Sequence, residues 1–237
     1  MILTTDFHTH ILPGIDDGCQ SVQDSVKLIQ CELKDGIENI FLTPHFYPQQ
    51  MFPSSFLENR NQAMEQLLAS FPSDAQLPNL ILGAEVLYCP GMSQWEQLDS
   101  LTLGNSNYIL IEMPFDRWSD NTFLELKRIC KRGLTPILAH IERSIPVLGA
   151  ARFINCLHAL PVLLQSNCEF FTDKRTQRTA LKLLAEKKIH IIGSDCHRPN
   201  WRSPNMSQAK EIILNNIDHE TRLHLKQSEN LILSSMR

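Results

Sequence analysis

The chain has 237 residues, 43% of them apolar, and a formal net charge of −4, so it can bury the core of one large α/β domain but presents no basic run for nucleic acid. Its seven cysteines are an odd number without a Cys-x-x-Cys pair, which disfavours a disulfide scaffold and favours reduced thiols in a cytoplasmic protein. No apolar run approaches the roughly 20 residues of a membrane helix and no secretory leader is visible, so we expect no direct insertion into a membrane.

Short apolar runs alternate with longer amphipathic segments along the chain, as in parallel strands joined by helices. Strands are predicted at residues 3–8, 39–43, 79–85, 107–112, 135–140, 161–166 and 190–195. Helices are predicted at residues 21–36, 54–71, 121–133, 176–188 and, in the tail, from about 205 to 235. Seven such units favour a single α/β domain over residues 1–237, folded as a distorted (β/α)7 TIM-like barrel.

Side chains that can bind metal stand at the ends of most predicted strands. His8 and His10 share one face of the first strand, because alternate residues of a strand point the same way. Six of the seven strand ends carry His, Asp or Glu, and the full set is His8, His10, Asp16, Asp17, His45, Glu85, Glu112, His140, Asp195 and His197. The carboxyl ends of barrel strands meet at one face, and burying so many polar groups without a cation would be costly. We therefore predict a metal centre.

The composition of this set indicates the kind of metal and the kind of reaction. Imidazoles and carboxylates without a thiolate suit Mn, Fe, Zn or Co. The set is too large for one ion, and two or three divalent ions can clamp an oxyanion and activate water, as in phosphate-ester hydrolysis. Arg143 and Arg202 follow two of the candidate ligands and match phosphate oxygens, with Arg198 a weaker candidate. The four other histidines, at positions 158, 190, 219 and 224, are expected to be structural.

Several motifs occur in a recognisable order. They are "DFHTHILPGIDDG", "TPH", "GAE", "IEMP", "HIER" and "SDCH". In this order the sequence resembles the PHP (polymerase and histidinol phosphatase) superfamily over essentially its whole length. It is most similar to the bacterial metal-dependent protein-tyrosine phosphatases encoded with capsule and exopolysaccharide genes. The resemblance implies a distorted barrel with three metal ions at the carboxyl ends of its strands.

The resemblance also implies a role for each matching residue. The first metal would be held by His8, His10, Glu85 and Asp195. Glu85 would bridge to a second metal, held also by Glu112 and His140. The third metal would be held by Asp17, His45 and His197, with Asp16 as the alternative to Asp17. Arg143 and Arg202 would bind the phosphate.

The family implies manganese as the usual metal and a phosphotyrosine protein as substrate, the tail of a membrane-associated tyrosine kinase that controls polysaccharide export. Two stretches depart from the family pattern. "HIERS" has Ile141 and Ser144 where proline and tyrosine are common. Phe170 and Phe171 stand where a small, glycine-containing stretch is usual, and their effect on the substrate entrance is left open by the sequence.

Three alternatives remain open from the sequence. The first is another phosphomonoesterase of the same superfamily, such as a histidinol-phosphate phosphatase. The second is a cysteine-dependent mechanism, because Cys196 and Arg202 have the spacing C-x5-R. The third is a metal-binding barrel without catalytic activity.

Overall fold

The fold is built on a curled sheet of parallel strands. The computed structural model describes residues 3–115, 118–145, 157 and 160–236. Its strands are β1 (Thr5–Thr9), β2 (Asn39–Leu42), β3 (His45–Phe46), β4 (Asn79–Leu82), β5 (Glu85–Leu87), β6 (Tyr108–Glu112), β7 (Thr135–Leu138), β8 (Leu163–Asn167) and β9 (Ile191–Gly193). Strands β1, β2 and β4 pair in that order, and β3, β5, β6, β7, β8 and β9 pair in a second series. The parallel α/β architecture predicted from the sequence is thus observed.

Two predicted strands are each broken in two. The strand predicted at residues 39–43 is observed as β2, and after a break the chain forms β3. The strand predicted at residues 79–85 is divided into β4 and β5. The second break lies at Gly83, where an added Cβ would approach a Leu103 methyl carbon to 2.6 Å. The buried Arg60 guanidinium donates to the Gly83 carbonyl at 2.9 Å. After the breaks, His45 and Glu85 lie opposite each other in the parallel pairing of β3 and β5.

The first and last strands meet at the level of predicted metal ligands. The Asp195 N–H donates to the His8 carbonyl at 2.8 Å, and the His10 N–H donates to the Cys196 carbonyl at 2.9 Å. The regular alternation of seven strands with seven helices is not reproduced. Residues 88–107 form the 3-10 turns η1 (Met92–Gln94), η2 (Leu98–Leu101) and η3 (Leu103–Asn105) in place of an α-helix. The link from β7 to β8 lies largely outside the described residues.

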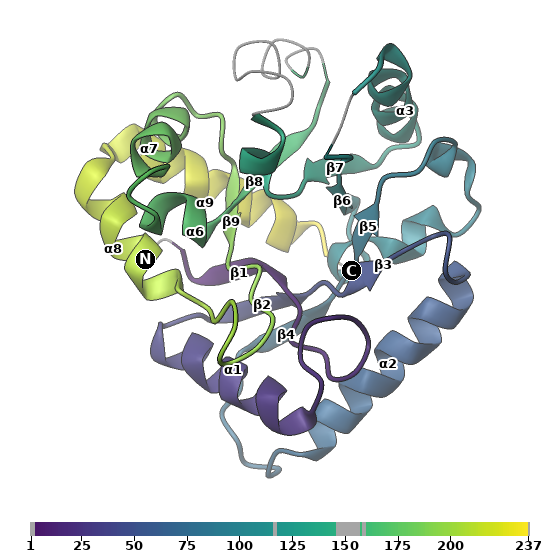
Figure 1. The fold of residues 1–237 in the computed structure, drawn as a ribbon, viewed down its shortest axis with the longest axis vertical. Coiled ribbons are helices and arrows are strands. Elements are labelled where there is room, and N and C mark those ends of the chain that lie inside the picture. Colours follow the sequence, from purple (N-terminus) through teal and green to yellow (C-terminus); the bar gives the residue numbers. More distant parts are fainter. Residues whose placement is uncertain (1–2, 116–117, 146–156, 158–159, 237) are drawn as a thin grey trace.

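The predicted helices are observed, with one of them divided. They are α1 (Val22–Lys34), α2 (Pro53–Ala69), α3 (Asp120–Lys131), α7 (Gln177–Ala185), α8 (Met206–Asn216) and α9 (His219–Ser234). The predicted tail helix splits because Asp218 accepts from the Thr221 N–H at 2.8 Å and so begins a new helix. Figure 1 shows the helices around the outside of the curled sheet, with α1 and α2 on one side and α7, α8 and α9 on another.

Phe170 and Phe171 lie in a short helix that the sequence did not predict. Phe170 and Phe171 lie in α6 (Cys168–Thr172) and are 6% and 0% exposed. They belong to the hydrophobic core, where α6 packs against α7 and α8. Both rings therefore serve the packing of this short helix. Among the described residues, no helix combines the length and apolarity needed to cross a bilayer.

Candidate metal centre

The nine predicted ligands converge at the carboxyl ends of the strands. Three groups each bring one nitrogen or oxygen atom per residue within 4.8 Å of the others. These groups are His8, His10 and Glu85; His45, Glu85 and Glu112; and His10, Asp17, His45 and His197. The two remaining predicted ligands lie beside them. His140 Nε2 is 3.5 Å from a Glu112 oxygen, and His10 Nε2 is 3.3 Å from Asp195 Oδ1. The role of each residue as a ligand stays a prediction.

Glu85 lies at the middle of the cluster. Its Oε2 atom is 3.1 Å from His8 Nε2, 3.4 Å from His10 Nε2 and 3.0 Å from His45 Nδ1. Its Oε1 atom is 2.8 Å from His140 Nε2. Burial opposes ionisation of this carboxyl, yet the charges of His8 and His45 hold its pKa well below the usual value. Glu85 is therefore a buried carboxylate that faces four imidazoles.

The residues present fit divalent cations. His45 Nδ1 and Glu85 Oε2 are buried and have no hydrogen bond of good geometry, although they lie 3.0 Å apart. The Nε2 atoms of His8 and His10 face each other at 3.2 Å. Lone pairs that point at a shared space instead of at donors are what a coordinated ion requires. Buried polar atoms without partners are otherwise rare in folded proteins.

A second layer of side chains orients the imidazoles. Asp16 accepts from His10 Nδ1 at 2.7 Å and from the His45 N–H at 3.0 Å. Burial opposes the charge of Asp16, but His10 lowers its pKa to about 2. Asp17 Oδ1 instead faces the ring nitrogens, 3.6 Å from His197 Nε2 and 3.7 Å from His45 Nε2. The geometry thus groups Asp17 with the other predicted ligands and gives Asp16 the carboxylate–histidine contact common around metals.

The sequence reasoning missed Gln165 and Asn167. Gln165 Oε1 lies 3.3 Å from His8 Nδ1 and accepts from the His140 N–H at 2.7 Å. Asn167 donates to Asp195 Oδ2 at 2.7 Å. Both residues lie in β8, and the corresponding predicted strand was the one without a metal-binding side chain at its end. The signal was therefore present in the sequence as amides at the end of the sixth predicted strand, which can orient ligands without being ligands themselves.

The histidines have different affinities for protons. Burial lowers the pKa of His140, but hydrogen bonds to Glu112 and Glu85 outweigh it and raise the value to about 9. Burial and the charge of His10 lower the pKa of His197 to about 4. The centre therefore holds protons next to its carboxylates when no cation is bound, and protons and metal ions compete for the same nitrogen atoms.

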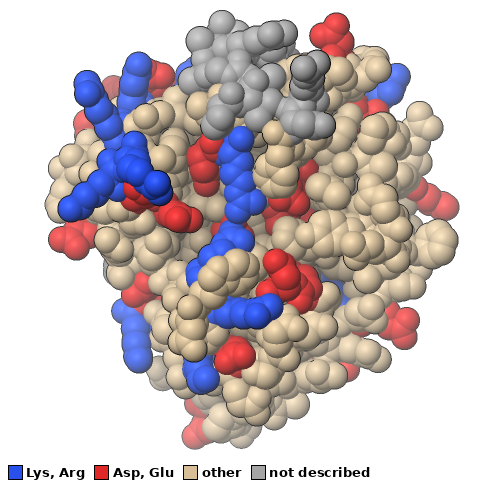
Figure 2. Space-filling model, viewed as in Figure 1, with Lys and Arg blue, Asp and Glu red and all other residues tan. Residues whose placement is uncertain are grey.

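The two predicted phosphate-binding arginines converge on one carboxylate oxygen. Asp195 Oδ2 accepts from Arg143 at 3.1 Å and also from Arg202. The Arg143 side chain is 36% exposed and the Arg202 side chain is 28% exposed. In Figure 2, basic atoms cross the middle of this face with acidic atoms on both sides. Arg198 instead donates to the backbone carbonyls of Asp17 and Gly18, so it holds their loop.

Three of the six non-glycine residues with a positive φ among the described residues lie at this centre. His140, Asp195 and Arg202 have φ angles of 32°, 54° and 56°, in the left-handed region that non-glycine residues seldom adopt. Such strain commonly marks functional sites. Gly18 allows the loop to approach the first strand closely, because an added Cβ would lie 2.2 Å from the His10 carbonyl oxygen.

The cysteine-dependent alternative is not supported by the geometry. Cys196 is fully buried. Burial, together with Glu32 and Asp6, raises the pKa of its thiol well above the usual value. A nucleophilic cysteine needs a thiolate that substrate can reach. The C-x5-R spacing of Cys196 and Arg202 is therefore not a catalytic motif in this fold.

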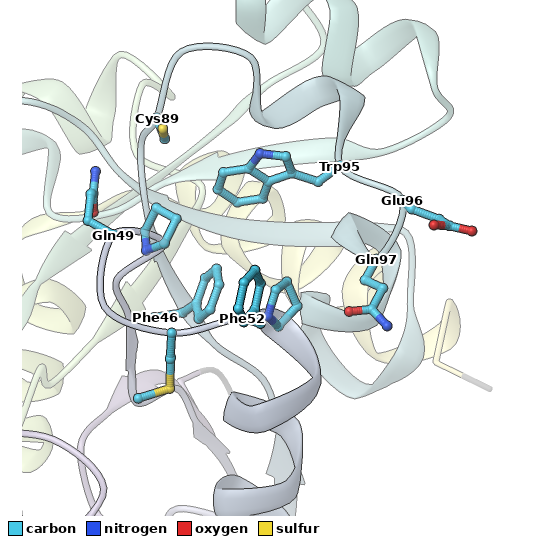
Figure 3. A pocket seen from close by; sticks show the side chains of 10 residues that line it. Phe46, Gln49, Phe52, Cys89, Trp95, Glu96 and Gln97 are labelled. Carbon is cyan, nitrogen blue, oxygen red and sulfur yellow. The ribbon is translucent and has the colours of Figure 1, made fainter.

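Two cavities lie near the metal centre. The first, of about 450 Å³, is mostly apolar and has Phe46, Phe52 and Trp95 in its wall (Figure 3). None of the nine predicted ligands lines it. The second, of about 410 Å³, is polar and includes Arg202 and Asn167. The second cavity therefore adjoins the centre through one of the arginines.

Comparison with known proteins gives consistent results. Residues 4–232 match the family described as capsular polysaccharide synthesis, CpsB/CapC. The chain is 26% identical over 239 residues to the tyrosine-protein phosphatase YwqE of Bacillus subtilis, covering 96% of this chain and 91% of YwqE. It is 28% identical over 229 residues to the tyrosine-protein phosphatase CpsB of Streptococcus pneumoniae, covering 88% of each.

The fold is also similar to a solved one. A chain from the crystal structures of YwqE from Bacillus subtilis and CpsB from Streptococcus pneumoniae, described as metal-dependent tyrosine phosphatases, aligns with a TM-score of 0.83. The alignment has 23% identity and covers 98% of this chain and 95% of that chain. This likeness confirms the α/β fold with its curled parallel sheet.

Proposed function

The chain belongs to the capsular polysaccharide synthesis family CpsB/CapC, and from this premise we propose that it is a metal-dependent protein-tyrosine phosphatase. The relatives YwqE and CpsB carry that activity in their names. The observation that carries the proposal is the cluster itself, in which five histidines and four carboxylates meet beside two arginines. Such a site can bind cations and an anion side by side.

The ligand set supports up to three divalent ions, with manganese as the first choice. His8, His10, Glu85 and Asp195 would hold the first ion, and Glu85, Glu112 and His140 the second. Asp17, His45 and His197 would hold the third. Bound ions would supply positive charge to the phosphoryl oxygens and lower the pKa of the attacking water. The curled sheet would then be the distorted seven-stranded barrel of the PHP superfamily, which the hydrogen bonds between the two terminal strands support.

The chain's own residues position the phosphate. Arg143 and Arg202 both reach Asp195 Oδ2, so their remaining N–H groups can bind two oxygens of one phosphoryl group. Asp16 holds the Nδ1 proton of His10 and leaves Nε2 free to face the centre. The leaving phenol has a pKa near 10, so the phenolate needs little help from an acid. Cys196 is buried, which favours direct hydrolysis over a cysteinyl phosphoenzyme.

The substrate in the cell would be a phosphotyrosine protein, the cytoplasmic tail of a membrane-associated tyrosine kinase that regulates capsule or exopolysaccharide export. The family description as capsular polysaccharide synthesis supports this role. The absence of a membrane-crossing helix among the described residues is compatible with a cytoplasmic enzyme that reaches the membrane through its partner.

A phosphatase assay tests the proposal. The protein is stripped with a chelator, reloaded separately with Mn, Fe, Zn or Co, and assayed on a phosphotyrosine peptide, a phosphoserine peptide and histidinol phosphate. We expect no activity after chelation, recovery with at least one metal and a preference for phosphotyrosine. A preference for histidinol phosphate would assign another phosphomonoesterase activity. Metal binding without hydrolysis of any substrate would favour the non-catalytic barrel.

A further inference from the structure

Three aromatic rings stand around the metal centre, each against a different predicted ligand. Tyr47 stacks on His45 with ring centroids 5.0 Å apart, and Phe115 stacks on His140 at 6.3 Å. Trp201 meets His197 edge-on at 5.4 Å. The rings come from segments that follow three different strands, so the metal centre has an aromatic border that its ligand chemistry does not require.

Two of these rings are exposed and lie against the arginines. Phe115 is 54% exposed and Trp201 is 52% exposed. The Arg143 guanidinium carbon lies 5.7 Å from the Phe115 ring centroid, and the Arg202 guanidinium carbon lies 5.7 Å from the Trp201 ring centroid. Large exposed aromatic side chains grouped at a cleft commonly mark a binding surface. An exposed aromatic ring therefore lies beside each arginine, next to the position proposed for phosphate.

The backbone of Trp201 is fixed in this place. Its backbone N–H donates to the Arg198 carbonyl at 3.1 Å, and its carbonyl accepts from the Arg198 backbone N–H at 3.0 Å. The Arg198 guanidinium carbon lies 5.8 Å from the same ring centroid. Arg198 is in turn tied to the loop of Asp17 and Gly18. An aromatic ring fixed in advance loses little conformational entropy when a ligand stacks against it.

We propose that Phe115 and Trp201 form an aromatic clamp that binds the ring of an aryl phosphate and so selects aryl over alkyl phosphate esters. The inference rests on the proposed phosphatase function and names the group next to the phosphorus that the site recognises. Each ring lies beside one of the two arginines proposed to hold the phosphoryl group. A phenyl ring attached to that group would offer a large apolar surface to these rings, whereas the short alkyl carbon of phosphoserine would offer little.

Binding of two phosphonates tests the clamp without any turnover. Phenylphosphonate and methylphosphonate share the phosphonate group and differ in its substituent, an aromatic ring in one and a methyl group in the other. We expect the manganese-loaded protein to bind phenylphosphonate more tightly in calorimetry. Trp201→Ala and Phe115→Ala should each weaken phenylphosphonate by about 3- to 10-fold, the usual size of an aromatic contact, and leave methylphosphonate within 2-fold. Trp201→Phe should restore most of the preference.

Kinetics on small esters give a second measurement. With phenyl phosphate, the alanine variants should raise KM by about the same 3- to 10-fold with kcat within 2-fold, while KM for O-phosphoserine stays unchanged. Phe52→Ala is the matched control, because Phe52 is 79% exposed and lies in the wall of the apolar cavity (Figure 3). This control should leave both esters unchanged.

The outcomes separate the clamp from the proposed function. If the alanine variants lose equal affinity for phenylphosphonate and methylphosphonate, the rings only support the arginines, and the clamp is overturned. A parent protein without preference for phenylphosphonate would overturn it as well. A clear phenylphosphonate preference without hydrolysis of any ester would uphold the clamp and defeat the phosphatase proposal.

Discussion

Two regions of this protein bury carboxyl groups, and they shift the pKa of the buried glutamate in opposite directions. Glu85 in the metal centre faces four imidazoles, and its pKa lies well below the usual value. Glu32 in α1 is also fully buried, but its neighbour is the carboxyl of Asp6. Burial and the negative charge of Asp6 raise the pKa of Glu32 well above its usual value. The surroundings therefore favour the charged form of Glu85 and the neutral form of Glu32.

The difference shows that burial of acids does not by itself make a cation site. Asp6 has its Oδ1 atom satisfied by the N–H groups of His8 and Ser194, at 3.1 and 2.9 Å, and burial raises its pKa. It ties together the two strands that carry His8 and Asp195. Opposite charge decides the ionisation of a buried acid, so the imidazoles and arginines, more than the acids, define the metal centre.

Glu85→Gln and Glu32→Gln form a matched pair that can break this comparison, because both make the same chemical change at a fully buried position. We expect Glu85→Gln to lose on the order of 10³-fold or more in phosphatase activity and to bind fewer metal ions, because it removes the central negative charge. Glu32→Gln should stay near the parent in both. Metal analysis and kcat/KM on phosphotyrosine peptide measure the effects, and equal losses in the two variants would contradict the distinction.

Arg143→Ala and Arg202→Ala test the cationic side of the centre. Each should lower the rate by about 10²- to 10³-fold, as when a donor to a developing negative charge is removed. Arg175→Ala is the control, because Arg175 is 88% exposed and pairs with Asp173 outside the metal cluster. Steady-state kinetics with saturating manganese measure the loss. Activity within twofold of the parent in both variants would remove the arginines from the site.

His190 sharpens the comparison, because no carboxylate in the described part of the chain pairs with it. Burial, with the nearby His224 and Lys188, lowers its pKa to about 4, and its Nδ1 atom accepts from the Leu164 N–H at 3.1 Å. As pH falls, the unfolded chain takes up a proton on His190 near pH 6.5, whereas the folded chain does so only near pH 4. The folded state therefore loses up to about 3 kcal/mol of stability as pH falls from 6.5 to about 4. His190→Asn, which keeps an acceptor, should flatten this slope in urea unfolding of the metal-free protein. An unchanged slope would contradict the assignment.

The smallest effect is expected for the stability of Glu32→Gln. Above pH 4.5 the unfolded parent releases the Glu32 proton while the folded parent keeps it, so the parent loses stability as pH rises. Gln has no proton to release. The variant should equal the parent or exceed it by up to about 1 kcal/mol at pH 8, with the gap closing toward pH 4.5. Urea midpoints at both pH values measure this, and a variant much less stable at pH 8 would show that Glu32 is ionised.

Local sequence features were sufficient for the elements and for most of the site. Caps and periodicity predicted α1, α2, α3 and α7 to within a few residues, because these signals lie inside each segment. The predicted metal ligands were recognised because they follow apolar runs, and the structure brings them together. The breaks in two strands and the buried place of Phe171 could not be predicted, since both depend on distant packing partners.

By itself, the sequence determined which side chains stand at the strand ends and therefore which chemistry is available. The tertiary structure alone decided which of them meet, that Asp17 faces the imidazoles while Asp16 supports His10, and that Gln165 orients two ligands. It also decided that the pKa of Glu85 is lowered and that of Glu32 is raised. The physical reason is that the free energy of a buried charge depends on the groups within a few ångströms of it, and residues far apart in the chain become such neighbours only when the sheet curls.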